Sequence, residues 1–186
     1  MDVKVAIDMR RAYRSLIQVE ITKELVEDLA TNAQLAPSCF NNQPTRFIFV
    51  YENEILNKLK DALNPGNAWA KAASMIIAVF GKKDSDCDVK GRIYYLFDIG
   101  QATAFLQLRA TELGLVAHPI AGYDEGKVKE VLNIPDAMTV ITLVIVGKKS
   151  DTISPVLSEK QAASERVRPE RKPLNEFVYH NHYTRD

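Results

Sequence analysis

Three arginines lie close together near the start of the chain, in the segment Arg10-Arg11-Ala12-Tyr13-Arg14. Guanidinium groups donate charge-assisted hydrogen bonds to phosphate oxygens, and each such bond contributes about 1.5–3 kcal/mol. Arg10 and Arg14 are four residues apart, so in a helix they would share one face and repel each other. This arrangement favours an anion such as a phosphomonoester between them, and a solvated basic turn is the alternative.

A loop rich in amide side chains runs from residue 36 to residue 45. It carries Ser38, Asn41, Asn42 and Gln43 between two prolines. Amides provide paired hydrogen-bond donors and acceptors, which suit a heterocycle with alternating N–H and C=O groups. The loop is therefore a candidate ligand contact, with a plain surface turn as the alternative.

A third candidate segment, residues 119–124, precedes a predicted helix. Gly122 stands just before Asp124, which has the side chain of a helix N-cap. Because glycine has no side chain, its backbone N–H can approach a planar ligand closely.

Other catalytic and metal-binding patterns are missing from the sequence. It contains neither the glycine-rich dinucleotide fingerprint nor the phosphate-binding loop of nucleoside triphosphatases. His180 and His182 have no cysteine or carboxylate at ligand spacing, so no metal site is predicted. Cys39 has no evident general base and is interpreted as an ordinary small residue. No side chain is predicted to act as a catalytic acid, base or nucleophile.

Composition restricts the class of protein. The 186 residues carry 24 basic and 24 acidic side chains, and this balance argues against general nucleic-acid binding. The longest uncharged apolar run, residues 138–147, is far shorter than the roughly 20 residues of a bilayer span. No signal peptide is recognised, and the two cysteines indicate a reduced compartment without a disulfide. A single-domain cytoplasmic protein, spanning residues 1–186, is the expectation.

Hydrophobic patterns predict the elements that position these segments. Three strands are expected at residues 46–51, 74–80 and 138–146, the last as a central strand. Helices are expected at residues 22–36, 55–63, about 92–113 and 124–132. Strands that alternate with helices indicate an α/β or α+β sheet domain. The tail from about residue 148 to 186 is expected to be an extended arm.

The predicted helix at 92–113 is apolar around much of its circumference. Gly100, Ala104 and Leu108 recur every four positions, with Phe97 and Phe105 nearby. Such a helix is buried on more than one side. It is either a central core helix or the contact of a two-fold dimer.

The chain resembles the FMN-dependent nitroreductase family in five motifs that follow one another in the family's order. They are R-R-x-x-R at 10–14, A-P-S-x-x-N-x-Q-P at 36–44, D-x-G-x-A at 98–102 leading to Gly114-Leu115, P-I-x-G-[YF]-D at 119–124, and R-K-P-L at 171–174. The resemblance extends over about residues 6 to 178. It implies a homodimer of α+β fold, with a mostly antiparallel sheet flanked by helices and two FMN sites at the interface.

The resemblance also implies a set of FMN-binding residues. The phosphate and ribityl end would be held by Arg10, Arg11, Ala12 and Arg14, with Arg171 or Lys172 from the tail. The isoalloxazine would be contacted from the partner subunit by Pro37, Ser38, Cys39, Asn41 and, more weakly, Gln43. The N5 edge would lie over Ala121 and Gly122, and the pyrimidine side would be near Asn67 and Lys71.

The implied reaction is a ping-pong transfer. NADH or NADPH would deliver hydride to FMN, and a nitroaromatic, quinone or free flavin would then accept it. The chain has Thr45 where many members have Trp, Ala12 where several have Ser, and Ala121 where some have Glu. These departures affect nicotinamide use and substrate range more than FMN binding. A dimeric flavin carrier or sensor without turnover is the alternative, and a nucleic-acid contact through residues 166–172 is a third interpretation.

Overall fold

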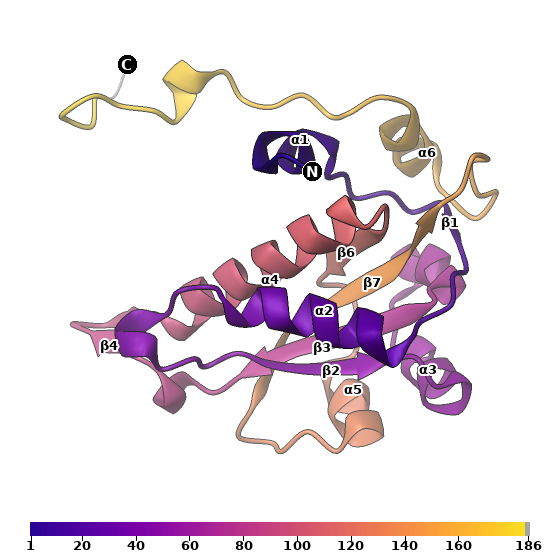
Figure 1. Ribbon diagram of the computed structural model, residues 1–186, viewed down its shortest axis with the longest axis horizontal. Helices are drawn as coiled ribbons and strands as arrows, with labels where there is room; N and C mark the ends of the chain where they lie inside the picture. The colour runs from indigo at the N-terminus through magenta and orange to yellow at the C-terminus, as the bar shows by residue number, and fades with distance from the viewer. Residues whose placement is uncertain (185–186) are drawn as a thin grey trace.

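An antiparallel sheet forms the centre of the fold in the computed structural model, which describes residues 1–184 (Figure 1). Its longest strand is β7 (Thr139–Lys149), which pairs with β3 (Met75–Gly81), and β3 pairs with β2 (Arg46–Val50). The strand β7 also pairs with β6 (Val116–Ile120) and, at its end, with β1 (Leu16–Ile17). All of these pairings are antiparallel, as the predicted fold class requires.

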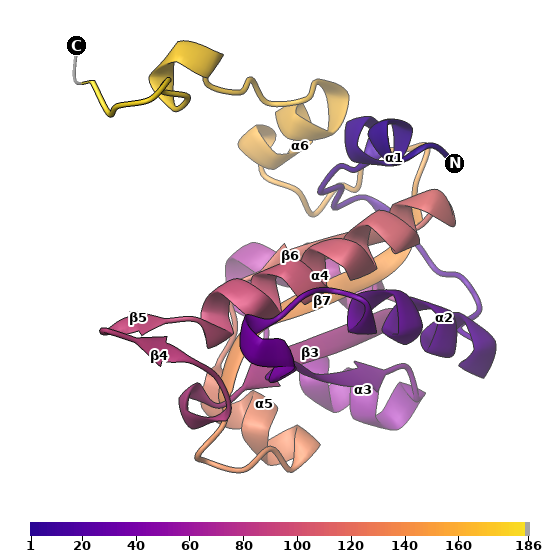
Figure 2. The same cartoon turned by 60° about the vertical axis from the view of Figure 1, so that its left-hand side comes forward.

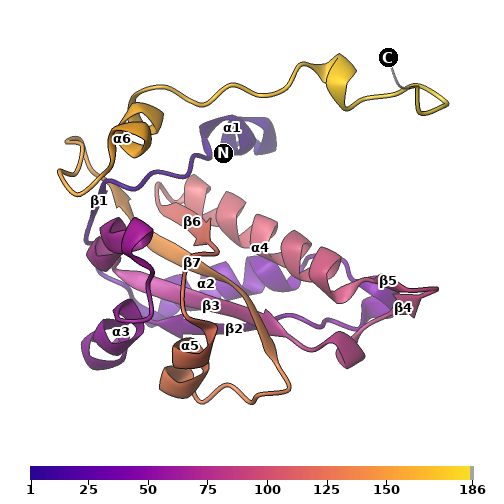
Figure 3. The same cartoon turned by 180° about the vertical axis from the view of Figure 1, so that it is seen from behind.

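The middle strands are apolar on both faces because helices cover both faces of the sheet (Figures 2 and 3). Alternate residues of a strand point to opposite faces. In β3, Ile76, Ala78 and Phe80 join one core, whereas Met75, Ile77 and Val79 join the other.

Five helical segments supply these two layers. One face packs against α2 (Lys23–Gln34) and α4 (Tyr95–Glu112). The other face packs against α3 (Asn53–Lys60), the 3-10 segment η2 (Pro65–Ala72) and α5 (Glu125–Leu132). The three strands and four helices predicted from the sequence are therefore confirmed, with small shifts at their ends.

The predicted helix ends follow from local chemistry. The Thr22 hydroxyl accepts from the backbone N–H of Leu25 at 3.2 Å, and the Asp124 carboxylate accepts from that of Lys127 at 3.1 Å. Gly114 follows α4 with φ +75°, the left-handed conformation that glycine adopts without strain. The long helix begins at Tyr95 rather than near residue 92, because β5 (Arg92–Ile93) turns back to pair with β4 (Asp88–Val89).

Several elements were not predicted from the sequence. The strand β6 contains Pro119, which cannot donate to a ladder, and β6 lies at the sheet edge where such a residue is tolerated. Helix α1 (Val3–Met9) packs near α4, and α6 (Glu159–Arg166) lies within the predicted arm. Short 3-10 turns occur at η1 (Cys39–Asn41), η3 (Lys83–Ser85) and η4 (Leu174–Glu176).

Beyond α6 the chain runs along the outside of the molecule from residue 167 to residue 184, and these residues are largely exposed (Figure 1). The last two positions of the predicted arm, 185 and 186, lie outside the described residues. Within residues 1–184, no helix combines the length and hydropathy needed to cross a bilayer.

Candidate functional site

The N-terminal arginines and the C-terminal tail line one cavity of about 400 Å³. Its lining comes from two segments that lie far apart in the chain, one that follows α1 and one that comprises α6 and the start of the tail. Both lie on the same side of the molecule in Figures 1–3. The lining residues are Arg10, Arg11, Ala12, Arg14, Lys160, Gln161, Ser164, Arg168, Pro169 and Arg171.

The backbone of the arginine segment is not helical, so Arg10 and Arg14 do not share a helical face. Helix α1 ends at Met9, and Arg10 has φ −57° and ψ 118°. The following residues, up to β1, have no regular secondary structure. The two arginines reach the same cavity because the chain passes along it, not because they share a helical face.

Helix α6 holds this segment in place. The Arg11 guanidinium donates to the carbonyl of Ser164 at 2.6 Å, and that of Arg14 donates to the Ser164 hydroxyl at 3.2 Å. The buried Glu165 carboxylate accepts from the backbone N–H groups of Arg14 at 2.9 Å and Ser15 at 3.1 Å. A buried carboxylate with two backbone donors is a rigid support, so α6 positions the arginines.

The charged side chains that line the cavity are all basic. None of the residues that line it is acidic. Burial lowers the pKa of Arg10, and the positive charges of Arg168 and Arg171 lower it further. Among the described residues, the Arg10 side chain has neither an ion pair nor a hydrogen bond, so a bound anion would relieve this repulsion.

The tail supplies residues that differ in part from those expected. Arg171 lines the cavity as predicted, whereas Lys172 is exposed and pairs with Glu176 at 3.6 Å. Arg168, Lys160, Gln161 and Ser164 also line it and were not selected from the sequence. The capping box formed by Ser158 and Gln161 is the signal that would have revealed α6.

The segment η2 continues this site toward the loop after β6. Gln161 donates to the carbonyl of Gly66 at 3.0 Å, and the Arg14 guanidinium lies 5.9 Å from the ring centroid of Trp69. Asn67 donates to the carbonyl of Gly122 at 2.9 Å. Asn67 and Gly122 are thus brought together, as the predicted site needs.

Gly122 has no room for a side chain. A Cβ atom there would lie 2.6 Å from the Asn67 side-chain nitrogen. The Gly122 carbonyl accepts from both Asn67 and the Asn64 backbone, so it is already engaged within the chain. Ala121 and Lys71 are both exposed beside these elements.

A buried histidine lies beneath the arginine segment. His118 stacks on Trp69 with ring centroids 4.7 Å apart, and its Nδ1 is 3.0 Å from the carbonyl of Tyr13. Since that carbonyl can only accept, Nδ1 is assigned as the protonated nitrogen. Burial lowers the pKa of His118 to about 4, and the positive charges of Arg14 and Arg10 contribute to the shift.

The amide-rich loop lies at the opposite end of the sheet from the basic cavity, near β4 in Figures 1–3. Pro37, Ser38 and Gln43 line a different cavity of about 170 Å³, together with Asp98 and other residues. A single chain therefore does not bring residues 37–43 to the arginines.

The loop is held in a strained conformation. Phe40, Asn41 and Gln43 have φ values of 48°, 57° and 50°, and each such conformation costs a non-glycine residue on the order of 1 kcal/mol. The Cys39 N–H donates to the buried carboxylate of Asp98 at 2.7 Å. Burial raises the pKa of Asp98, and the neighbouring Asp86 raises it further.

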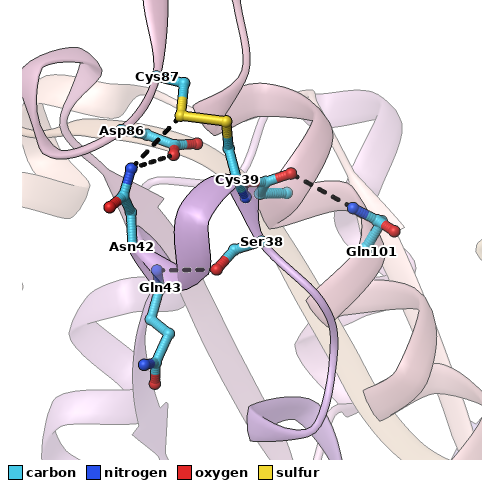
Figure 4. Close-up of a disulfide and its surroundings, with 8 residues drawn as sticks. Ser38, Cys39, Asn42, Gln43, Asp86, Cys87 and Gln101 are labelled. Atoms are coloured by element: carbon cyan, nitrogen blue, oxygen red, sulfur yellow. Dashed lines mark hydrogen bonds between the residues drawn. A yellow bond between two sulfur atoms is a disulfide. The ribbon is translucent and has the colours of Figure 1, made fainter.

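The two cysteines form a disulfide, which corrects the expectation of two unpaired thiols. Cys39 in the loop is bonded to Cys87, just before β4, with the Cα atoms 6.1 Å apart (Figure 4). Their separation of 48 residues in the chain hides this proximity from sequence reasoning. Asp86 lies within 4.8 Å of both sulfurs, but bonded sulfurs offer no thiolate to a metal ion.

Helix α4 buries one side and exposes the other. Ile99, Leu106 and Ala110 belong to the core. Phe97 is 62% exposed and Phe105 41%, and a Cβ atom at Gly100 would meet no atom within 4 Å. The core interpretation of this helix therefore holds for one side, and its other side carries apolar side chains that the described residues 1–184 cover only in part.

Comparisons with known proteins agree with this architecture. The model of the Nitroreductase family matches residues 7–68 and 63–148. MhqN of Bacillus subtilis (strain 168), whose name places it among NAD(P)H nitroreductases, is 26% identical over an alignment of 205 positions that spans 92% of this chain and 94% of the relative.

Two solved structures are similar over almost the whole chain. An oxidoreductase described as containing FMN is 28% identical with a TM-score of 0.84, over 99% of this chain and 94% of the other. A nitroreductase family protein from Clostridium difficile 630 is 26% identical with a TM-score of 0.79, over 98% of this chain and 100% of the other. The family model matches well over half of the chain, and we conclude that this protein belongs to the nitroreductase family.

Proposed function

We propose that this protein is an FMN-dependent NAD(P)H oxidoreductase that reduces nitroaromatic, quinone or flavin-type acceptors. The observation that carries the proposal is the basic cavity, whose lining includes five arginines and one lysine and no acidic side chain. A phosphate dianion fits this donor set, because guanidinium groups bind phosphate oxygens through charge-assisted hydrogen bonds. The FMN named in the description of one similar oxidoreductase is a ligand that carries such a group.

The chain's own residues would divide the binding of FMN among them. Arg10, Arg14 and Arg171 would bind the phosphate of FMN. Arg11 and Ala12 would lie beside the ribityl end of the cofactor. The ring would be contacted by Ala121, Gly122, Asn67 and Lys71 from the same chain and by Pro37, Ser38, Cys39, Asn41 and Gln43 from a partner subunit.

A homodimer is part of the proposal. The loop at 37–43 and the basic cavity lie at opposite ends of one chain, so a site that uses both needs two chains. The exposed side of α4 offers an apolar surface for such a contact. The exposed tail carries Leu174, Phe177 and Tyr183, which are suited to packing on a second subunit.

FMN, when bound, supplies the hydride chemistry, taking two electrons from NAD(P)H and giving them to the acceptor in a ping-pong cycle. The protein's part is to hold the phosphate, to orient the ring and to leave room for the nicotinamide and acceptor in turn. No side chain is assigned a catalytic proton transfer. We place this reaction in the cytoplasm, where NAD(P)H is available to an oxidoreductase.

The absorption spectrum of the purified protein, recorded before and after anaerobic addition of NADH or NADPH, tests the proposed function. A flavin spectrum that bleaches with either donor and returns with a quinone or nitroaromatic is the expected result. A flavin spectrum that persists would instead support a carrier or sensor without turnover. Absence of flavin, with no retention of added FMN, would contradict the proposal altogether.

Replacement of Gly100 by leucine is expected to weaken the homodimer. A single chain has room for the new side chain, so its fold should be retained, whereas a close helix contact across the dimer would be overpacked. The expected effect is a rise of about tenfold in the dimer dissociation constant, measured by sedimentation equilibrium. Asn57→Leu, at an exposed position of α3, is the control, and equal dimerisation of both variants would remove α4 from the interface.

A further inference from the structure

We propose that Cys39 and Cys87 form a reversible thiol–disulfide site that exchanges with dithiols and controls the position of the loop at 37–44. The bond joins this loop to the segment before β4 (Figure 4). The proposed hydride transfer passes no electrons through this bond, although Cys39 belongs to the proposed ring contacts, so the bond needs an explanation of its own. In the proposed cytoplasmic location, disulfides are usually transient and either catalytic or redox-sensing.

The disulfide lies at the edge of the single chain. Both cysteines are only partly buried, and neither belongs to the two hydrophobic cores. The β4–β5 hairpin that follows Cys87 projects from the body in Figures 1 and 2. A disulfide in such a place can be reached by an external thiol without unfolding of the core.

A neighbouring amide distinguishes the two sulfurs. The Asn42 side-chain nitrogen lies 3.5 Å from the Cys87 Sγ and 3.2 Å from the Asp86 carboxylate (Figure 4). A hydrogen-bond donor stabilises negative charge on sulfur, and a stabilised thiolate leaves faster in exchange. The geometry therefore assigns Cys87 as the leaving group and Cys39 as the sulfur that is attacked.

The exchange balances with a dithiol as the reductant. One thiolate of the dithiol attacks the Cys39 Sγ, the Sγ–Sγ bond breaks, and the electron pair goes to Cys87, which takes up a proton. The second thiol of the reagent, as its thiolate, then attacks the mixed disulfide and forms the reagent's own disulfide. Cys39 leaves as a thiol, so two electrons and two protons have passed from the dithiol to the protein.

Opening the bond has consequences for the loop. Phe40, Asn41 and Gln43 are held at positive φ, and the bond to Cys87 is the covalent constraint on this stretch. The contacts from Cys39 N–H to Asp98 and from Asn42 to Asp86 would remain, but both are hydrogen bonds that can exchange with water. Because Ser38 and Gln43 line the cavity of about 170 Å³, relaxation of the loop would change its shape.

Thiol counting on the native protein tests the site directly. The oxidised protein is incubated with dithiothreitol in the absence of denaturant, and free thiols are counted with a maleimide by mass spectrometry. We expect two thiols to appear and, once dithiothreitol has been removed, to disappear again with oxidised glutathione. A bond that is reduced only in denaturant, or thiols that never pair, would overturn the proposal. The count does not depend on bound flavin, so it is separate from the test of the proposed function.

Hydrogen–deuterium exchange tests the coupling to the loop. Peptides that cover residues 38–44 are expected to exchange faster after reduction, and the double variant C39S/C87S should show the faster exchange with or without dithiol. Identical exchange in both redox states would overturn the control of the loop. Asn42→Ala is expected to lower the rate of reduction by dithiothreitol about fivefold, which corresponds to the net free energy of one hydrogen bond. The control Asn57→Ala should leave this rate unchanged.

Discussion

Replacement of both Arg10 and Arg14 by alanine is expected to yield protein that is largely free of FMN. Each arginine lines the basic cavity, and each charge-assisted contact to a phosphate contributes about 1.5–3 kcal/mol. Loss of two such contacts raises the dissociation constant of FMN by a factor on the order of 10² to 10⁴. Titration of the apoprotein with FMN, followed by quenching of flavin fluorescence, measures the change.

Two controls separate the phosphate contact from a general loss of structure. Arg166→Ala removes an exposed arginine of α6 that does not line the cavity, and its FMN affinity should equal that of the unmodified protein. Riboflavin lacks the phosphate, so the double variant should bind it as well as the unmodified protein does. Full FMN occupancy in the double variant would show that the cavity does not bind the phosphate.

Acidification from pH 6.5 to pH 4 is expected to destabilise the fold through His118. Burial lowers the pKa of this histidine in the folded protein from 6.5 to about 4. Between these values the unfolded chain binds a proton that the folded chain does not, so the free energy of unfolding falls as the pH falls. The shift corresponds to roughly 3 kcal/mol once the pH reaches about 4, and the pH dependence from His118 fades out within about one unit above pH 6.5.

Urea denaturation at several pH values, compared between variants, isolates this contribution. His118→Asn keeps a donor near the Tyr13 carbonyl and removes the titrating ring, so its stability should depend less on pH over this range. His180→Asn, at an exposed position of the tail, is the matched control and should behave like the unmodified protein. A pH dependence that is unchanged in His118→Asn would show that other groups cause the acid sensitivity.

Local patterns in the sequence were sufficient for most of the secondary structure. The apolar strands β2, β3 and β7 are visible as short apolar runs in the sequence. The helices α2 and α5 are indicated by N-caps three residues apart along the chain, Thr22 with Leu25 and Asp124 with Lys127. Such interactions are visible in a linear sequence because they span only a few residues. The strand β6 was missed, since its run of five residues contains Pro119 and has no clear period.

The candidate site could be predicted only in part, because its residues meet over long distances. The sequence by itself indicated that arginines at 10, 11 and 14 were suited to an anion, and that Gly122 would allow a close backbone approach before a helix capped by Asp124. The non-helical path of the arginines and the role of Glu165 as their support were decided by tertiary packing of α6 against that segment.

The disulfide shows the same limit most clearly. Cysteine counting indicated two free thiols, whereas the fold places Cys39 beside Cys87. That proximity depends on the position of the β4–β5 hairpin, which directly precedes α4. It also depends on Asp98 of α4, whose carboxylate accepts a hydrogen bond from the Cys39 backbone. Composition and periodicity describe which residues a chain has and which local structures they favour. Only the packed sheet and helices decide which of those residues become neighbours.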